Sequence, residues 1–379
     1  KGKTTTTHMI RAILQAAGKK VGMIGTTGTV IGYVVTPTLN TTPESYELHQ
    51  AFAQMVEAGC EYAVMEVSSQ GIKMHRTDGL YFNYAIFTNI SPDHIGPGEH
   101  ADFEEYLYYK TRLLNMCGIG LVNKDDEHAP QIIKAANCEL YTYSEESKEA
   151  DFVASDIRYV SQPDFVGTEF HISGKYDMEV RLGIPGLFNV VNALAAVSVC
   201  SFLGLDQARI SHALENIRVN GRMEIVYTSE RCTVLVDYAH NAVSMESLLS
   251  TLRDYKPKRL VCVFGCGGNR SKDRRYSMGE IGGKMADLSI ITADNSRYEK
   301  VEDIIADIRG SIEKTGGKFI EIPDRREAIR YSILHAQPGD MVAVIGKGHE
   351  DYQEINGVRH HFLDREVIEE TVKELGEKA

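Results

Sequence analysis

Short apolar, β-branched runs alternate with stretches of helical spacing along most of the chain. Apolar residues within 48–56 recur on one helix face, and Gly59 then ends that helix. Two apolar runs that read as buried strands follow, over residues 62–67 and 85–89. This alternation predicts βαβ units and an α/β fold whose sheet is mostly parallel.

A similar alternation resumes in the second half of the chain and indicates a second domain. A helix that ends near Ile217 is followed by the helix breakers Asn220 and Gly221. We therefore predict two domains, residues 1–220 and 221–379. The segment 151–180 alternates in a different way and is predicted to be an antiparallel appendage, while further strands are predicted at 233–236, 260–264, 288–292 and 341–345.

Composition and charge narrow the classes of function. The 379 residues include 53 acidic and 41 basic side chains, and the net charge of −12 argues against nucleic acid or an anionic membrane as the main partner. No apolar run approaches the roughly 18 residues of a membrane span, and no signal peptide opens the sequence, so we expect a cytoplasmic protein. Seven scattered cysteines without a C-x-x-C pair indicate reduced thiols rather than a zinc site.

The opening Gly2-Lys3-Thr4 matches the end of a phosphate-binding loop, G-x-x-x-x-G-K-[ST]. In such loops backbone amides and the lysine hold phosphates, and the threonine ligates magnesium. A helix to about Ala17 follows and supplies the positive helix terminus that the loop needs. The first glycine of the motif and the strand before it are missing, so a nucleotide site and a chance match both remain open.

Polar residues at the ends of the predicted strands are candidates for metal chemistry. Glu66 stands in the otherwise apolar strand 62–67, where a charge without a purpose is costly to bury. The next strand leads to Asp93 and His94, and Lys110 lies in an apolar helix. Taken singly, each also has a structural reading: an edge carboxylate, a structural histidine and a surface lysine whose stem is buried.

In their order along the chain, the motifs resemble those of the Mur ligases, and among these most closely the ligase that adds the third residue of the peptidoglycan stem peptide. They cover nearly the whole chain and are GKTTTT from Gly2, NTTPE from Asn40, MEVSS from Met65, FTNISPDH from Phe87, Lys110, NVVNALAA from Asn189, GRME from Gly221, VDYAH from Val236, GCGGNR from Gly265, TADNSR from Thr292 and GKGHEDYQ from Gly346.

The resemblance implies a P-loop ATPase-type central domain and a C-terminal Rossmann-like α/β domain. It also implies an ATP-dependent ligase that requires Mg²⁺. In the family, a substrate carboxylate attacks the γ-phosphate of ATP, and an amino-acid amine then displaces phosphate from the acyl phosphate. The implied acceptor is UDP-MurNAc-L-Ala-D-Glu, and the amino acid is expected to be meso-diaminopimelate.

Residue roles follow from the same resemblance. The implied catalytic residues are Lys3, Glu66, His94 and Lys110. Magnesium would be ligated by Thr4, Glu66, His94 and Lys110, the last as a carbamate. ATP contacts would come from Gly2, Lys3, Thr4, Thr5, Asn189, Asn192, Arg222, Asp237 and His240. The UDP-MurNAc-dipeptide would be bound by Thr41, Thr42, Ser68 and Arg76.

The implied amino-acid pocket lies in the second domain. Its residues would be Arg270, Asp294, Asn295, Arg297, Gly346 and Glu350. An arginine at position 297 suits the distal carboxylate of diaminopimelate by a bidentate pair, whereas lysine lacks that carboxylate. Ser296 stands where the family usually has proline, so the turn is less rigid.

The family's N-terminal, UDP-binding domain is absent from this sequence, as is the first half of the phosphate loop. We therefore expect the polypeptide as printed to be weakly active or inactive, and the intact protein to extend upstream. The alternatives are an L-lysine-adding ligase, a folylpolyglutamate synthetase, whose substrate motifs fit less well, and a nucleotide-binding relic without catalysis.

Overall fold

A computed structural model describes residues 1–92, 95, 96 and 98–376, so the candidate ligand His94 lies outside the described residues. The chain forms two compact units. The first contains Lys1–Arg158, Glu169–Leu182 and Leu187–Ile217, and the second contains Tyr159–Thr168, Gly183–Gly186 and Arg218–Ala379. Both units are α/β structures, and taken together their sheets are mixed and mostly parallel, which confirms the predicted fold class.

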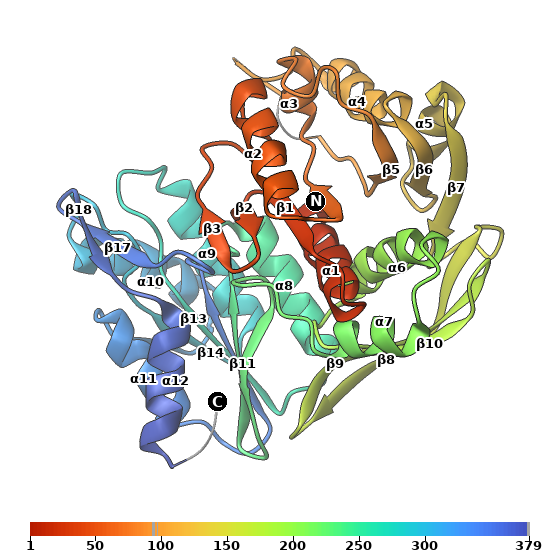
Figure 1. Ribbon diagram of the computed structural model, residues 1–379. Helices are drawn as coiled ribbons and strands as arrows, with labels where there is room; N and C mark the ends of the chain where they lie inside the picture. Colours follow the sequence, from red (N-terminus) through yellow and green to blue (C-terminus); the bar gives the residue numbers. More distant parts are fainter. Residues whose placement is uncertain (93–94, 97, 377–379) are drawn as a thin grey trace. The chain divides into compact units, whose positions relative to one another are not determined.

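The first unit begins with a four-stranded sheet in the order β3-β2-β1-β4. Figure 1 labels β1, β2 and β3 of this sheet. Its strands are β1 (Val21–Gly25), β2 (Gly28–Ile31), β3 (Val34–Thr36) and β4 (Tyr62–Met65). β1 pairs in parallel with β4 and antiparallel with β2. Two helices accompany this sheet, α1 (Lys3–Ala16) and α2 (Ser45–Glu57), and Leu48 and Met55 of α2 pack on Ile24.

A second sheet of the first unit has the order β10-β9-β8-β7-β6-β5. Its strands are β5 (Phe82–Phe87), β6 (Cys117–Asn123), β7 (Glu139–Ser144), β8 (Phe152–Gln162), β9 (Phe165–Gly174) and β10 (Met178–Leu182). β5 to β8 pair in parallel. β8 and β9 are joined by only two residues, which requires an antiparallel hairpin. The strand predicted at 85–89 is β5, which begins and ends earlier than the sequence pattern predicted.

The remaining helices of the first unit connect these strands. They are α3 (Ser69–Lys73), α4 (Phe103–Arg112), the short 3₁₀ helix η1 (Leu113–Asn115), α5 (Ala129–Ala135), α6 (Leu187–Phe202) and α7 (Gln207–Glu215). α6 is buried along most of its length because it packs on α1 and on the strands β6 and β7. This packing anchors α1 within the first unit.

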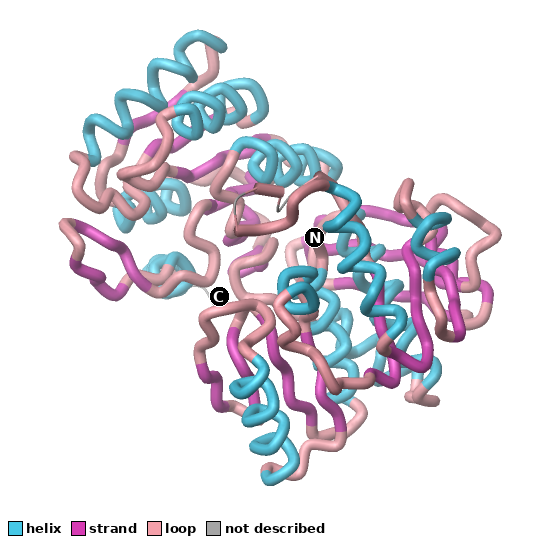
Figure 2. The backbone as a smooth tube through the Cα atoms, turned by 90° about the horizontal axis from the view of Figure 1, so that it is seen from above, coloured by secondary structure: helices cyan, strands magenta, loops and turns pink. Residues whose placement is uncertain are grey.

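The second unit is built on a six-stranded sheet in the order β11-β12-β16-β13-β14-β15. Figure 2 draws strands in magenta and helices in cyan. The strands are β11 (Glu224–Thr228), β12 (Cys232–Asp237), β13 (Arg259–Phe264), β14 (Leu288–Ile291), β15 (Phe319–Glu321) and β16 (Asp340–Ile345). Every pairing except β11 with β12 is parallel. The central strand β16 is buried at all of its positions, as expected for a parallel sheet covered on both faces.

Helices and one hairpin complete the second unit. They are α8 (Ala242–Asp254), α9 (Asp273–Met285), α10 (Val301–Thr315), α11 (Arg325–Leu334), α12 (Asp364–Glu374) and the hairpin β17 (Tyr352–Ile355) with β18 (Val358–His361). Ile329 of α11 and Ile368 of α12 join the main apolar core. None of the helices in the described part of the chain has both the length and the apolar character of a membrane span.

Candidate functional site

The first turn of α1 forms the candidate phosphate site. Gly2 adopts a left-handed conformation with φ 83°, and a β-carbon there would lie 2.4 Å from Asn192 Oδ1, so only glycine fits. The first helical hydrogen bond runs from Thr6 N to Gly2 O. The amides of the first turn therefore lack acceptors within the helix and point toward the site, an arrangement that favours an anion.

Glu66 lies beside this turn, directly after β4 rather than inside the strand as predicted. It is 3% exposed, and its carboxylate accepts hydrogen bonds from Thr4 Oγ1 and Thr26 N, both at 2.9 Å. A buried carboxylate next to a hydroxyl offers the oxygen ligands that Mg²⁺ prefers. Among the described residues no group of three or more His, Cys, Asp or Glu could hold a metal. Of the predicted magnesium set, the structure describes Thr4, Glu66 and Lys110.

Lys110 approaches the same turn from α4. Lys3 and Lys110 both line a small cavity of about 30 Å³, together with Ser69, Thr88 and Asn89. The ammonium of Lys110 lies 5.1 Å from the centre of the Tyr106 ring. Two lysines that border one cavity repel each other unless an anion lies between them or one of them loses its charge. The arrangement therefore suits either a bound phosphate or a carbamate on Lys110.

Asn189 and Asn192 lie on α6, next to the start of α1. Asn192 Oδ1 accepts a hydrogen bond from Thr6 Oγ1 at 3.3 Å, and Asn192 Nδ2 donates to Asn189 Oδ1 at 3.2 Å. Both side chains are buried, and the neighbouring Thr5 is buried as well. In this structure the two asparagines support the phosphate-site turn itself, while a contact with adenine stays a prediction.

The residues predicted to bind the dipeptide form one hydrogen-bonded group around Thr42. The fully buried Thr42 hydroxyl donates to the Glu66 backbone oxygen at 3.1 Å and accepts from Ser68 N at 2.9 Å. Arg76 Nη1 donates to the backbone oxygen of Thr42 at 3.2 Å. Thr41 joins through its hydroxyl, 3.0 Å from that of Thr26. The predicted dipeptide site therefore adjoins Glu66.

In the second unit, Arg222, Asp237 and His240 lie close together at the end of β12. Asp237 accepts hydrogen bonds from the backbone amides of Met223 and Ala239, both at 2.8 Å. Loss of solvation raises the pKa of the Asp237 carboxyl, and those two amides oppose the rise. Arg222 stacks on Tyr238 at 5.1 Å, and His240 Nδ1 lies 2.9 Å from the Tyr238 backbone oxygen.

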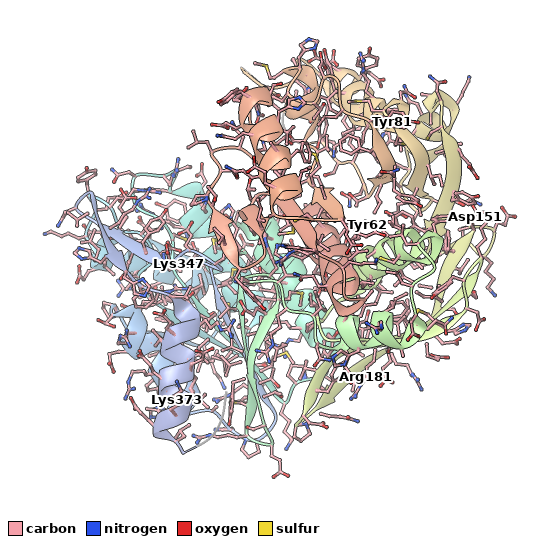
Figure 3. All side chains as sticks on the ribbon, in the orientation of Figure 1. Tyr62, Tyr81, Asp151, Arg181, Lys347 and Lys373 are labelled. Atoms are coloured by element: carbon pink, nitrogen blue, oxygen red, sulfur yellow. The ribbon has the colours of Figure 1, made fainter. Side chains whose placement is uncertain are left out.

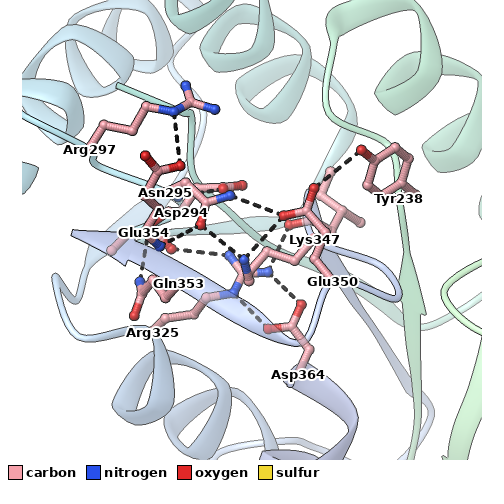
Figure 4. Close-up of polar contacts among 12 residues, drawn as sticks. Tyr238, Asp294, Asn295, Arg297, Arg325, Lys347, Glu350, Gln353, Glu354 and Asp364 are labelled. Atoms are coloured by element: carbon pink, nitrogen blue, oxygen red, sulfur yellow. Dashed lines mark hydrogen bonds and ion pairs between the residues drawn. The ribbon is translucent and has the colours of Figure 1, made fainter. Parts of the chain in front are cut away.

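The predicted amino-acid pocket is also assembled in the second unit (Figure 4). Asp294 and Asn295 are buried just after β14, and Asn295 Nδ2 donates to Glu350 Oε2 at 3.0 Å. Gly346 adopts φ 113°, and a β-carbon there would lie 2.7 Å from Asp294 Oδ2. The two motifs that carry these residues therefore converge at the carboxyl ends of β14 and β16, where open α/β sheets bind ligands.

Two arginines flank the glycine-rich turn after β13. A β-carbon on Gly267 would lie 3.4 Å from Arg297 Nη1 and 3.9 Å from Arg270 Cγ. Arg297 is anchored, because Nη1 donates to the Gly268 backbone oxygen at 2.7 Å and Nε lies 3.4 Å from Glu354. Two cations lie beside this turn, and among the described residues only Arg297 of the two has a carboxylate partner, so the turn favours a bound anion such as a carboxylate.

Sequence reasoning missed four charged residues of this region. Lys347 is fully buried and lies 3.2 Å from Asn295 Oδ1 and 3.4 Å from Glu350 Oε2, although it stands inside the GKGHEDYQ motif that was singled out. No local sequence pattern marks Glu354, Arg325 or Asp364, because their partners are distant in sequence.

Comparisons with known proteins identify the family of the chain. The sequence model of the Mur ligase middle domain matches residues 1–200, and that of the Mur ligase glutamate ligase domain matches residues 221–348. A "UDP-N-acetylmuramoyl-L-alanyl-D-glutamate--2,6-diaminopimelate ligase" of Caldanaerobacter subterraneus subsp. tengcongensis is 39% identical over 379 residues, which cover 98% of this chain and 76% of that protein. A ligase of the same name from Clostridium botulinum is 40% identical over 99% of this chain and 76% of its own length.

Solved structures extend the similarity to the fold. A structure of a ligase of that name aligns with a TM-score of 0.78 and 33% identity, over 100% of this chain and 77% of that one. The folylpolyglutamate synthase of Thermotoga maritima aligns with a TM-score of 0.68 over 91% of this chain and 84% of its own, at 18% identity. At that identity the second match supports a shared fold alone.

Proposed function

The chain belongs to the Mur ligase family of ATP-dependent amide-forming ligases, and on this premise we propose that it joins an amino acid to UDP-MurNAc-L-Ala-D-Glu in peptidoglycan biosynthesis. The observation that carries the proposal is the 2.9 Å hydrogen bond between Thr4 and the buried Glu66. It joins the phosphate-site turn to a carboxylate that can ligate Mg²⁺, and the predicted dipeptide residues lie next to it.

We assign the phosphates of ATP to the first turn of α1 and to Lys3. Thr4 and Glu66 would hold Mg²⁺, which neutralises charge on the phosphoryl oxygens when it is bound. The acceptor carboxylate would lie beside Thr42 and Ser68, where it attacks the γ-phosphate to give an acyl phosphate and ADP. Lys3 and Lys110 border the same cavity and would face the charge that develops there, Lys110 either as a cation or as a carbamate.

We propose meso-diaminopimelate as the amino acid. The pocket offers Arg270 and Arg297 for a carboxylate, and Glu350, Asn295 and the Gly346 carbonyl for an ammonium group. Diaminopimelate carries both groups at its distal end, whereas L-lysine would leave the arginines without an anion. The relatives named as diaminopimelate ligases support the same choice.

The test is an assay of phosphate release and ligated product with ATP, Mg²⁺ and the dipeptide acceptor. It compares meso-diaminopimelate, L-lysine and no amino acid. The protein is assayed as printed and as an extended protein, in which the amino-terminal region of the Caldanaerobacter relative is fused ahead of Lys1. Product only with diaminopimelate is the expected result. Phosphate release that does not depend on any amino acid would contradict a ligase.

A further inference from the structure

A buried ammonium group lies beside the carboxylate that we assign to the ammonium of the amino acid. Lys347 is fully buried, and its Nζ lies 3.4 Å from Glu350 Oε2 and 3.2 Å from Asn295 Oδ1 (Figure 4). By contrast, Lys373, which is labelled with Lys347 in Figure 3, is exposed to solvent on α12. Burial of an ammonium is unfavourable unless nearby anions offset the lost solvation, so a lysine at position 347 calls for an explanation that a surface lysine does not.

Lys347 fixes the orientation of the Asn295 amide. Asn295 Oδ1 accepts from Lys347 Nζ and, at 2.9 Å, from the backbone amide of Glu354. Because only the oxygen of an amide side chain accepts hydrogen bonds, these two donors turn Nδ2 toward Glu350, whose Oε2 accepts from it at 3.0 Å. Glu350 Oε1 accepts from the Tyr238 hydroxyl at 3.3 Å. Both oxygens of the Glu350 carboxylate are therefore held by the protein itself.

The predicted pocket and its ion-pair partners carry balanced charge. Lys347 adds a cation at Glu350, and Glu354 adds a carboxylate at Arg297. The cations are then Arg270, Arg297 and Lys347, and the carboxylates are Asp294, Glu350 and Glu354. The distal end of meso-diaminopimelate is also balanced, since it carries one carboxylate and one ammonium, whereas the distal end of L-lysine carries one positive charge. A pocket of balanced charge, partly shielded from water, opposes the unbalanced ligand.

The charge of Lys347, and not its volume, distinguishes this residue. Its Nζ lies 5.2 Å from the centre of the Tyr352 ring, and the flexible side chain of methionine could fill the same space. Without the ammonium, Glu350 would keep its full negative charge beside the place of the ligand ammonium. Such a pocket would attract any amino acid that ends in an ammonium group, L-lysine included.

We propose that Lys347 is a positioning residue that determines amino-acid specificity, because it holds Glu350 and cancels part of its charge, so that L-lysine is rejected. The inference rests on the proposed function and adds a second selective element to Arg297. Arg297 would attract the distal carboxylate of diaminopimelate, whereas Lys347 would oppose a ligand that brings an ammonium without a carboxylate. Lys347 acts through Glu350 and Asn295 and does not itself need to contact the amino acid.

The experiment compares Lys347→Met and Lys347→Gln with the parent in the extended protein. Methionine removes the charge and the hydrogen bonds, whereas glutamine removes the charge and can still donate to Asn295, so Lys347→Gln carries the test if the melting temperature shows that Lys347→Met is unfolded. The control is Arg259→Met, which takes the cation from another buried carboxylate, Asp340, at the amino ends of β13 and β16.

Two quantities are measured for meso-diaminopimelate and for L-lysine. The first is kcat/KM in the ligation assay. The second is the dissociation constant from isothermal titration calorimetry, with the dipeptide acceptor and a non-hydrolysable ATP analogue present. We expect the preference for diaminopimelate over L-lysine to fall by at least about tenfold in both quantities in each folded Lys347 variant, and to stay unchanged in Arg259→Met.

A merely structural role would give a different result. Equal losses with both amino acids, or the same fall in preference in Arg259→Met, would overturn the proposal. A parent protein that binds diaminopimelate selectively but forms no product would contradict the proposed ligase, while the ratio of dissociation constants would still test Lys347. A parent protein that binds neither amino acid would overturn the pocket and this inference with it.

Discussion

Arg325 and Asp364 form a bidentate ion pair in the interior of the second unit, with Nε to Oδ1 and Nη2 to Oδ2 both at 2.7 Å. Neither side chain is exposed. The same guanidinium donates to the backbone oxygens of Ala293 at 3.2 Å and Ile345 at 3.0 Å. The pair therefore ties together the ends of β14 and β16, from which the amino-acid motifs at 294–297 and 346–350 continue (Figure 4).

Arg325→Met should weaken both folding and amino-acid binding. Removing one partner leaves Asp364 as a buried charge, so we expect the free energy of unfolding to fall by about 3–5 kcal/mol. In the extended protein we expect the KM for the amino acid to rise by about tenfold or more while the KM for ATP changes little, because the two strand ends lose their common anchor. Chemical denaturation and initial rates measure the two effects.

The matched control is Arg259→Met. Arg259 pairs with Asp340, but at the amino ends of β13 and β16, away from the motifs, and it is partly exposed. Its loss should lower stability without a change in the KM for the amino acid. If both variants raise that KM equally, the effect of Arg325 is general destabilisation and not positioning.

Glu66→Gln tests the proposed magnesium site. The amide keeps the size of the side chain and can still accept from Thr4, but it removes the negative charge. We expect ligation by the extended protein to fall by at least about 100-fold, with a higher Mg²⁺ concentration needed for half-maximal rate. Glu61→Gln, just before the other end of β4, is the control, since Glu61 contacts Lys19 and the Lys20 backbone amide. An unaltered Mg²⁺ dependence in Glu66→Gln would remove Glu66 from the metal set.

Much of the fold follows from local pattern. The apolar run 260–264 became β13 and the helix face at 48–56 became part of α2, because burial of one face decides such elements. The hairpin of β2 and β3 was not predicted, and β3 is exposed at all of its positions, so it has no burial pattern to detect. β4 ends at Met65, before Glu66, since the chain turns there to place the carboxylate at Thr4.

The residues of the candidate site could be predicted only where they lie within a recognisable sequence motif. Thr42 comes from one short motif and Glu66 and Ser68 from another, and the structure brings them into one hydrogen-bonded group. The Arg325 and Asp364 pair joins residues 39 positions apart. Its members could not be recognised from sequence, because an arginine and an aspartate at helix starts look like ordinary surface residues until the fold buries them together.

The raised pKa of Glu145 predicts that the stability of the first unit depends on pH. Burial, followed by the neighbouring Asp125 and Glu146 charges, raises the pKa of the Glu145 carboxyl to about 7. The folded protein therefore keeps a proton that the unfolded chain releases near its ordinary pKa, so this residue's contribution to stability is complete below pH 4 to 5 and is lost as the pH rises through 7.

Glu145→Gln should remove that loss. We expect the variant to be more stable than the parent by about 1 kcal/mol at pH 8, a value reduced because the group is only half-buried, and to show little difference at pH 5. Urea denaturation at the two pH values measures this difference. Glu127→Gln, which alters an exposed carboxylate in the same unit, serves as the control. A gain of equal size at both pH values would show that Glu145 does not titrate as described.

We expect Arg297 to decide the choice between meso-diaminopimelate and L-lysine. Its guanidinium is held by the Gly268 backbone oxygen and Glu354, so its position beside the glycine-rich turn is fixed before a ligand arrives at the predicted pocket. Arg297→Met should lower kcat/KM of the extended protein for meso-diaminopimelate by about 100-fold and leave the low rate with L-lysine nearly unchanged, since lysine has no distal carboxylate to lose. Arg359→Met is the control, because Arg359 also lies near this hairpin but stacks on Tyr352 at 4.3 Å. If Arg297→Met slows both amino acids alike, Arg297 shapes the pocket without selecting its ligand, and the distal carboxylate must be recognised by Arg270.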